Sequence, residues 1–398
     1  MRKPAPSIKS RFALRVAACL VAMIAAMLPF EAARTATGDA TPPPPPPPPS
    51  PSASPSTAGV ADAARIVTPE VIQAVEAMKA GNAARAAAFL RPAAENGDPD
   101  AQALLGQLYL EGSGLERDLV EAGRWLRAAA GNGQPEGTYL LATAVEVGLL
   151  TVPGMAENDA AARMAEAARL YIAAATSGSL PAMVEAGLRY ARGDGVAKDT
   201  LAASRWFREA ARQGSADAQF NLGALHAAGE LAGGAPDHAA AVPWFEQAAA
   251  RGHTDAQYNL GLIAAQGLAG EVDNAAAVRW FEAASTAGLA DARAGLAWLV
   301  YHGLGTEKDE ARAAALYGQA ADQGHPIARN RLARLLIMGR GIEQDFVEAY
   351  KWHLLARADG LADEDLEARF ASLLDAQARA AGEARADEWR AARETSAP

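Results

Sequence analysis

Short glycine-rich turns are the feature of this sequence that most resembles a chemical motif. GSG at 112–114, GDG at 193–195 and GLG at 303–305 each carry two glycines two positions apart. Such turns cradle phosphate groups when they join a strand to a helix and point backbone N–H groups at the anion. Here they recur at a regular interval between two expected helices, where glycine commonly ends a helix in the left-handed conformation. We therefore interpret them as helix ends, and the sequence contains no P-loop, GxGxxG, HExxH or GxSxG pattern.

Histidine and cysteine give no further chemical pattern. No two of the six histidines are spaced as metal ligands, and His253 and His325 each follow a glycine in an expected turn. The other four are His226, His238, His302 and His353. The single cysteine, Cys19, lies near the N-terminus, which excludes a disulfide, a cysteine nucleophile and a thiolate metal site from the rest of the chain. We predict no catalytic residue, no metal site and no cofactor.

The composition favours an all-helical protein that does not bind nucleic acid. Apolar residues make up 50% of the 398 residues but aromatic residues only 6%, and much of the difference is alanine. Alanine has the highest helix propensity, and an alanine-rich core requires closely packed helices. The net charge is −10, to which residues 1–34 contribute +5, leaving −15 for the remainder. A chain this acidic is unsuited to holding phosphate backbones.

The first 66 residues have the composition of a targeting segment and a spacer. Residues 1–37 combine basic residues with an uncharged apolar run from Val16 to Phe30 and small residues after it, which is typical of a secretory signal. The predicted location is therefore the periplasm or outside the cell, and an uncleaved anchor in the inner membrane, facing the periplasm, is the alternative. Residues 38–66 include eight consecutive prolines and are predicted to be a disordered, extended linker.

A glycine repeat organises the rest of the chain. The glycines that close successive units are Gly97, Gly133, Gly178, Gly214, Gly252, Gly288, Gly324 and Gly360. Five of the seven intervals between them are 36 residues long, and the other two are 45 and 38. In each of the seven units a second glycine lies fifteen residues after the closing glycine that precedes the unit. Most units carry tryptophan eight residues before their own closing glycine, and all carry alanine four residues before it. Such a period indicates a solenoid.

Each unit is predicted to consist of helix A, a turn, helix B and a second turn. In residues 179–214, for example, Gly193 ends helix A and Asp199 caps helix B by accepting a backbone N–H. Glu121 follows the capping Asp118 by three residues, which predicts a reciprocal capping box. Tryptophan on helix B and alanine one turn later are expected to form a knob and a gap through which neighbouring units pack.

These features resemble the Sel-one-like repeat (SLR) family, which is related to the tetratricopeptide repeats. The matching segments are ADAQFNLGALHAAG at 216–229, GDGVAKD at 193–199 and SRWFREAARQG at 204–214. The resemblance implies an all-α fold, namely a right-handed α/α solenoid of about seven helix–turn–helix repeats with capping helices. It also implies a superhelix whose concave side is lined largely by helix A.

The predicted domains follow the glycine repeat. An atypical N-terminal repeat (67–97) precedes the SLR solenoid (98–360), and capping helices with a tail follow it (361–398). The seven units of the solenoid are 98–133, 134–178, 179–214, 215–252, 253–288, 289–324 and 325–360. Two units are longer than the others, and we expect irregular loops at their extra residues, around Leu149–Glu157 and before Asp237.

Polar and aromatic positions on the expected helix A are the candidates for a binding site. The predicted partner-binding residues are Gln219, Asn221, Gln257, Tyr258, Asn259, Arg293, Trp298, Tyr301 and Arg329. Aromatic residues and arginine are common anchors of protein interfaces. The same positions would also suit the packing between repeats, since glutamine can cap a neighbouring turn and Tyr258 or Trp298 can fill a core.

We therefore expect a protein-binding adaptor or regulator in the cell envelope rather than an enzyme. Its partner is a protein, and it contacts the membrane only if the N-terminal segment is uncleaved. By resemblance, exported members of the family act in envelope signalling, polysaccharide export or host-cell interaction. A cell-wall protein that binds or processes peptidoglycan or polysaccharide is the alternative, which a buried pair of acids with a raised pKa in the groove would support. Self-association along the solenoid is a third hypothesis.

Overall fold

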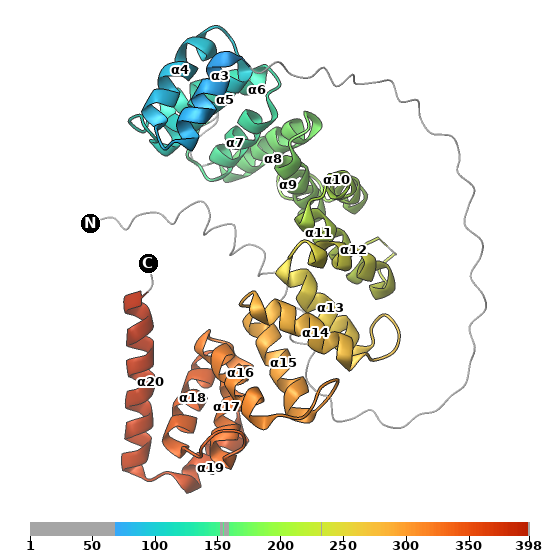
Figure 1. Cartoon of the computed structure of the whole chain (residues 1–398), viewed down its shortest axis with the longest axis vertical. Helices are drawn as coiled ribbons and strands as arrows, with labels where there is room; N and C mark the ends of the chain where they lie inside the picture. Colours follow the sequence, from blue (N-terminus) through green and yellow to red (C-terminus); the bar gives the residue numbers. More distant parts are fainter. Residues whose placement is uncertain (1–67, 152–153, 155–158, 232, 397–398) are drawn as a thin grey trace, which may run out of the picture. The chain divides into compact units, whose positions relative to one another are not determined.

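The computed structural model describes residues 68–151, 154, 159–231 and 233–396. The predicted signal (1–37) lies outside the described residues, and so does the predicted linker (38–66). Within the described ranges the chain forms 18 helices and no strand (Figure 1). The predicted all-α fold is confirmed. None of the helices in these ranges is both long and apolar enough to cross a membrane.

The helices follow one another in pairs. The first pair is α3 (Pro69–Lys79) and α4 (Ala83–Glu95). The A helices of the repeated units are α5 (Pro99–Glu111), α7 (Pro135–Glu146), α9 (Leu180–Arg192), α11 (Ala216–Ala227), α13 (Thr254–Gln266), α15 (Ala290–His302) and α17 (Pro326–Met338). The B helices are α6 (Leu119–Gly131), α8 (Ala160–Thr176), α10 (Thr200–Arg212), α12 (His238–Ala250), α14 (Asn274–Thr286), α16 (Glu310–Asp322) and α18 (Phe346–Ala358). The last two helices are α19 (Glu364–Leu373) and α20 (Ala376–Ser396).

Each helix up to α18 packs against the helix that follows it. Every helix B from α6 to α16 therefore contacts helix A of its own unit and helix A of the next unit. Buried apolar clusters follow this order along the chain, from the one centred on α4 and α5 to the one that joins α15 to α20. A single pair buries only part of its apolar surface, so that the stacking of neighbours completes each core. The predicted α-solenoid of helix pairs is confirmed.

Aspartate fixes the start of every helix B. Its side chain accepts a backbone N–H of the first helical turn at Asp118, Asp159, Asp199, Asp237, Asp273, Asp309 and Asp345. The predicted capping box at Asp118, however, is wrong. The N–H of Asp118 donates to the carbonyl of Tyr109 on helix A at 3.2 Å and is therefore not available to Glu121. The carboxylate of Glu121 instead accepts from Nε1 of Trp125 at 3.0 Å.

The main buried knob of helix B is the residue after the tryptophan. In three consecutive units the tryptophan is only half-buried (Trp206, Trp244 and Trp280) whereas the following phenylalanine is buried (Phe207, Phe245 and Phe281). Each of these rings lies against a glycine in the middle of helix A of the same unit (Gly187, Gly223 and Gly261). The prediction that tryptophan supplies the buried knob is therefore wrong for these three units, where the next side chain faces helix A. It is right for Trp125 and Trp352, which are each 5% exposed. The expected alanines, such as Ala210 and Ala248, are buried.

The unit at 134–178 has a longer helix B and a longer connection than its neighbours. Helix α8 contains 17 residues, whereas α6 and α10 contain 13 each. The connection runs from the end of α7 at Glu146 to the start of α8 at Ala160, where the loop around Leu149–Glu157 was expected. Residues 152–153 and 155–158 of it lie outside the described part of the chain.

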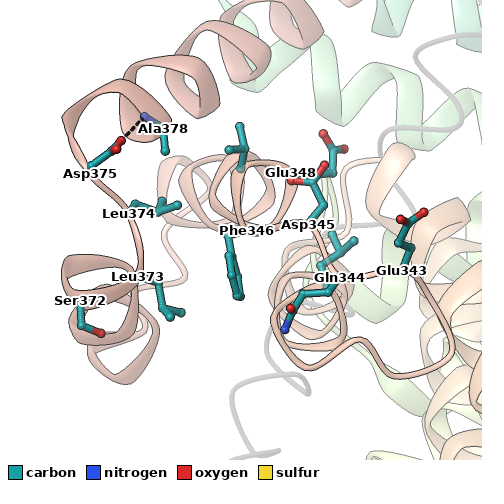
Figure 2. Close-up of a pocket in the computed structure, with 12 residues that line it drawn as sticks. Glu343, Gln344, Asp345, Phe346, Glu348, Ser372, Leu373, Leu374, Asp375 and Ala378 are labelled. Atoms are coloured by element: carbon teal, nitrogen blue, oxygen red, sulfur yellow. Dashed lines mark hydrogen bonds between the residues drawn. The ribbon is translucent and has the colours of Figure 1, made fainter.

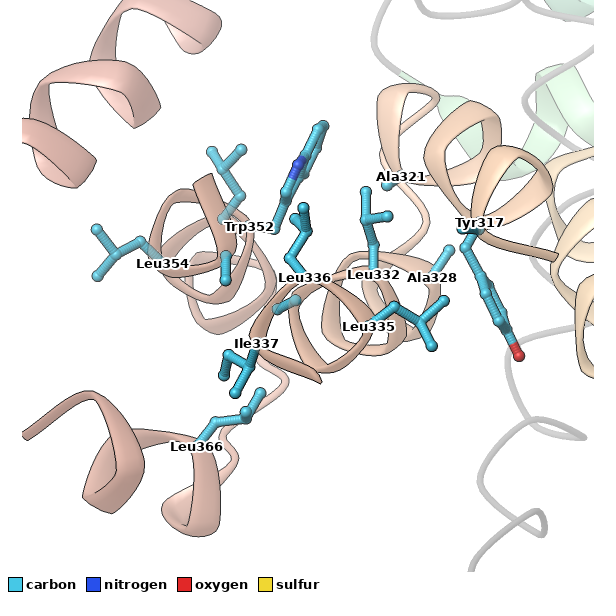
Figure 3. Packing of buried hydrophobic residues seen from close by; sticks show 14 of the residues in the cluster. Tyr317, Ala321, Ala328, Leu332, Leu335, Leu336, Ile337, Trp352, Leu354 and Leu366 are labelled. Carbon is cyan, nitrogen blue, oxygen red and sulfur yellow. The ribbon is translucent and has the colours of Figure 1, made fainter. Parts of the chain in front are cut away.

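The C-terminal helices close the array. In Figure 3, Ile337 of α17 lies next to Leu366 of α19, and both are buried in the cluster that ends the solenoid. Helix α20 packs against α18, where its Trp389 makes an edge contact with Trp352 at 6.0 Å between ring centroids. Trp352 is 5% exposed, unlike the half-buried tryptophans of three other units. Helix α20 therefore covers the apolar surface that a following repeat would otherwise cover.

Candidate functional site

A buried group of two carboxylates and one arginine lies where α7, α8 and α9 meet. Nη2 of Arg189 is 2.8 Å from Oε2 of Glu146 and 3.2 Å from Oε2 of Glu185. The hydroxyl of Tyr171 also donates to Oε2 of Glu146, at 2.9 Å. One guanidinium thus links a carboxylate of α7 to a carboxylate of its own helix α9, and the tyrosine hydroxyl adds a bond from α8. We assign this group to holding the three helices together.

Histidine and acidic side chains serve the fold in several places. Nδ1 of His253 accepts the N–H of Ala256 at 3.3 Å, and Nδ1 of His325 accepts the N–H of Ala328 at 3.1 Å. These two histidines therefore cap α13 and α17. In the described ranges no three histidine, cysteine, aspartate or glutamate side chains are grouped so that they could hold a metal ion.

Three of the predicted partner-binding residues bond to the preceding helix B. Nε2 of Gln219 donates to the carbonyl of Ala211 at 3.5 Å, and Nε2 of Gln257 donates to the carbonyl of Ala249 at 3.4 Å. Arg329 has the same arrangement, with Nε donating to the carbonyl of its own preceding helix at 3.1 Å. Each side chain thus satisfies a carbonyl at the end of a helix. This gives the three residues an intramolecular role, and their partner-binding role stays a prediction.

Four further predicted residues are distributed over α11, α13 and α15. Asn221 and Asn259 each donate to a carbonyl one turn earlier in their own helix, at 2.7 Å in both cases. Tyr258 is 5% exposed and packs against Phe281 at 5.7 Å between ring centroids. Arg293 is half-buried on α15. The structure brings none of these four into a common pocket.

Trp298 and Tyr301 line one pocket between α15, α16 and α17. Its volume is about 180 Å³, and its other lining residues are His302, Tyr317, Arg331, Arg334, Leu335 and Met338. Trp298 is 39% exposed and Met338 is 43% exposed, so that both are accessible from solvent. Leu335 and Tyr317 form the wall that faces the buried cluster (Figure 3). We call this pocket the α15–α17 pocket.

Aromatic contacts hold the α15 side of the α15–α17 pocket in place. The His302 ring lies 4.9 Å from the Trp298 ring and meets the Tyr301 ring edge-on at 5.1 Å, both between centroids. The hydroxyl of Tyr301 accepts from Nη1 of Arg340 at 2.9 Å. Nζ of Lys308 lies 5.8 Å from the centre of the Tyr301 ring, within reach of a cation–π interaction. These contacts link the rings of Trp298, Tyr301 and His302 to one another and to Arg340 and Lys308 at one side of the pocket.

Basic groups surround the α15–α17 pocket. Burial, and then the charges of Arg331 and Lys308, lower the pKa of His302 below its ordinary value, so that its ring is neutral at neutral pH. Arg334 pairs with Asp363 at 2.7 Å and with Asp365 at 3.0 Å. Arg331 is exposed and forms no ion pair or hydrogen bond with any residue that the structure describes. Arg331 therefore remains available to a negatively charged group.

Sequence reasoning identified part of this pocket. Trp298 and Tyr301 were predicted, whereas Arg331 was not, although it occupies the helix A position of Asn221 and Asn259, seven residues after a closing glycine. His302 follows Trp298 by one helical turn, a spacing that places both on one face. Met338 was missed, and its exposure at the end of α17 has no counterpart in the repeat pattern.

A second, larger hollow of about 990 Å³ lies between the start of α18 and the bend from α19 to α20 (Figure 2). Acidic side chains line it, but several of them already have partners. Asp345 caps α18 and pairs with Arg385 of α20 at 3.1 Å, and Asp375 accepts the N–H of Ala378 at the start of α20. We therefore assign these carboxylates to fixing α20 on the array.

Comparison with known families supports the repeat assignment. The family model described as Sel1 repeat matches more than half of the chain, at residues 77–98, 99–134, 180–215, 216–253, 254–289, 290–325 and 326–361. The unmatched stretch 135–179 corresponds to the unit with the long connection. No curated protein matches this chain.

Two solved structures illustrate the likeness. The chain is 26% identical to a Sel1 repeat protein from Oxalobacter formigenes, and the match covers 77% of this chain and 85% of that one with a TM-score of 0.57. It is 24% identical to a protective antigen of uropathogenic Escherichia coli strains that displays an SLR fold, with coverage of 80% and 83% and a TM-score of 0.36. The first of these structures shares the fold of helix pairs described above.

Proposed function

Because the chain belongs to the Sel1 repeat family, whose members typically mediate protein–protein interactions, we propose that it is an adaptor for a protein partner in the cell envelope. The observation that carries this proposal is the α15–α17 pocket, where Trp298, Tyr301 and Arg331 come together. Tryptophan, tyrosine and arginine are the residues most enriched among the hot spots of protein interfaces. Their position on helices A agrees with the surface that the family resemblance implies.

The envelope location rests on the N-terminal sequence. Basic residues precede the apolar run from Val16 to Phe30, and small residues follow it, as in an export signal. The single cysteine lies within this segment, so that the part of the chain after it carries no free thiol in an oxidising compartment. The proline-rich segment at 38–66 would act as a spacer between this address and the repeats.

A role in binding accounts for the site better than catalysis does. The α15–α17 pocket holds no carboxylate among its lining residues. The buried carboxylates of Glu146 and Glu185 share Arg189 in contacts that join α7, α8 and α9, outside this pocket. The family itself is a scaffold fold that is generally non-enzymatic.

Crosslinking in intact cells tests the adaptor function. The full chain with a C-terminal tag would be crosslinked in the envelope, purified and analysed by mass spectrometry, alongside the variant Trp298→Ala, Arg331→Ala. A matched control changes the exposed Leu201 and Arg205 of α10 to alanine. Fractionation of the same cells, with N-terminal sequencing of the recovered chain, tests the location and the cleavage of the signal.

The expected result is an envelope protein that is captured by the native chain and by the control but is lost with the pocket variant. Capture that is equal in all three chains would remove the pocket from the proposal. Recovery of the chain alone, or of glycan fragments, would overturn the adaptor function and favour self-association or cell-wall binding.

A further inference from the structure

We propose that the α15–α17 pocket selects a short acidic segment of the partner in which a carboxylate lies beside one large apolar side chain. This inference rests on the proposed adaptor function and specifies the chemistry of its ligand. It is carried by the size of the pocket, by the composition of its walls and by the single basic group that remains without a partner there.

The size of the pocket limits the apolar part of the ligand to one side chain. Its volume is about 180 Å³, below the roughly 300–1,000 Å³ of sites that hold cofactors or drug-sized molecules. Leu335 and Tyr317 form an apolar wall, while Trp298 and Met338 stand exposed at the opening. Methionine adapts its shape to different apolar groups, and tryptophan supplies a large flat contact surface. Together they fit an aliphatic or aromatic side chain.

The charges around the pocket select the polar part of the ligand. Three of the four basic groups are already engaged: Lys308 pairs with Glu310 at 2.8 Å, Arg334 pairs with Asp363, and Arg340 donates to Tyr301. Arg331, by contrast, is exposed and forms no ion pair or hydrogen bond within the described ranges. A guanidinium group binds a carboxylate through two parallel hydrogen bonds. The ligand therefore carries a carboxylate within reach of Arg331.

The net charge of the chain limits the length of the acidic segment. The chain carries −10 overall, so an acidic run that extends beyond the basic groups around the pocket meets a chain of its own charge sign. At physiological salt, repulsion is screened beyond about 8 Å, whereas a carboxylate in contact with Arg331 is not. One or two carboxylates beside the apolar side chain therefore raise the affinity for the pocket, and further carboxylates do not. A nucleic acid, which needs several basic contacts, is a poor ligand for one free arginine.

An unbiased selection tests this inference. Random peptides of 12 residues displayed on phage would be selected on the full chain, with the variant Arg331→Glu as a parallel target. The recovered peptides would then be synthesised and their affinities measured by fluorescence anisotropy against the native chain, Arg331→Gln, Trp298→Ala and the Leu201→Ala, Arg205→Ala control. Circular dichroism and thermal melting of every variant establish that each one is folded.

We expect recovered peptides to contain aspartate or glutamate within two positions of a large apolar residue. Their affinity should fall about tenfold or more for Arg331→Gln and Trp298→Ala and should not change for the control, in the range of interface hot spots. Selection on Arg331→Glu should recover lysine or arginine in place of the acids. Lengthening the acidic run should not raise the affinity for the native chain.

Three results would overturn the inference. The first is a set of recovered peptides without acidic residues, and the second is a set whose affinity is unchanged by both pocket variants. In these two cases the chain still binds peptides, so that the adaptor function survives while the ligand chemistry fails. The third is a selection that recovers no peptide, which would show that the pocket is not a peptide site. The crosslinking experiment then decides separately whether the adaptor function fails as well.

Discussion

Gly223 of α11 lies under the ring of Phe245 of α12, so close that a Cβ at position 223 would come within 2.7 Å of Cδ1 and Cε1 of that ring. Contacts of that length do not occur between real side chains. The two helices of the unit can therefore approach to this distance only with glycine at position 223. The same relationship recurs between Gly187 and Phe207 in a neighbouring unit.

Changing Gly223 to alanine should destabilise the protein. Alanine gains about 1 kcal/mol of helix propensity over glycine, but forcing a methyl group into a packed core costs about 1–3 kcal/mol. We expect a net loss of about 1 kcal/mol in the free energy of unfolding, measured by urea denaturation.

Gly318 provides the matched control. It also lies within a helix, α16, but no atom lies within 4 Å of the position that its Cβ would take. Gly318→Ala should therefore stabilise the protein by about 0.5–1 kcal/mol, which is the propensity gain without the clash. Equal effects of the two substitutions would contradict the close packing of Gly223 on Phe245.

The fold was predictable where physical chemistry restricts the residue type. Only glycine adopts the left-handed conformation at little cost. Gly214 and Gly229, in the two predicted turns before and after α11, have φ values of +88° and +74°. Few side chains cap a helix, which is why Asp309 and its equivalents were recognisable. The knob of helix B was not predictable, because Trp244 and Phe245 are both large apolar residues and only the rotation of the helix decides which one is buried.

The binding site was less predictable because polarity does not reveal direction. Gln219 and Asn221 are both polar residues of the same helix A, yet the first is 1% exposed and bonds to another helix, whereas the second bonds within its own helix. Their positions differ by two residues, which places them on different faces of the helix. Trp298 and Tyr301 were predicted as binding residues from residue type alone, and the structure shows that they line the same pocket.

Changing Gln219 to alanine should reduce stability. The side chain is buried, and its removal leaves the carbonyl of Ala211 without this bond, for a loss of about 1–3 kcal/mol. The half-buried Asn221 should tolerate alanine with a change within about 0.5 kcal/mol. Thermal unfolding of both variants, followed by partner capture at a temperature where both are folded, separates the two roles. Loss of capture by folded Gln219→Ala with unchanged stability would show that Gln219 acts in binding instead.

Acid should weaken the C-terminal end of the solenoid through His353. This residue is 1% exposed, and burial lowers its pKa below the ordinary value near 6.5, while the nearby Glu367 opposes that shift and Arg357 adds to it. At pH 8 the ring is neutral in both the folded and the unfolded chain, so that its stability contribution is fully present. As the pH falls below about 6.5, the unfolded chain takes up a proton that the folded chain does not, and stability is lost.

The substitution His353→Leu tests this dependence. Leucine occupies the equivalent position in the first regular unit, as Leu126, and it does not titrate. The melting temperature of the native chain should fall between pH 8 and pH 5, and the melting temperature of the variant should fall by less over the same range. At lower pH Asp363 adds to the loss of stability in both chains. Its pKa is lowered in the folded chain: burial opposes this shift, but the hydrogen bond from Asn330, followed by other contacts, outweighs burial. Asp363 therefore stabilises the fold only while it is ionised. Parallel pH profiles of the two chains would contradict a role for His353.

Trp389 should decide whether α20 stays on the array. Its ring contacts Trp352 of α18 and lies 4.6 Å from the guanidinium of Arg329 in α17. Its Nε1 donates to Asp322 of α16 at 3.4 Å. This one side chain therefore joins α20 to three earlier helices. Few other residues of α20 are buried, notably Gly382 and Ala386. Trp389→Ala should therefore cost about 2–3 kcal/mol, less than the 3–5 kcal/mol for a fully buried tryptophan because the ring is half-buried.

The cost should appear locally, because each unit of a solenoid contacts only its neighbours. Hydrogen exchange should show faster exchange in α20, α18 and α17 of Trp389→Ala, with unchanged protection from α5 to α12. The exposed Arg390, one residue along, provides the control, and Arg390→Ala should leave the exchange pattern unaltered. Uniform loss of protection along the whole chain would instead show that α20 stabilises the array as one cooperative unit.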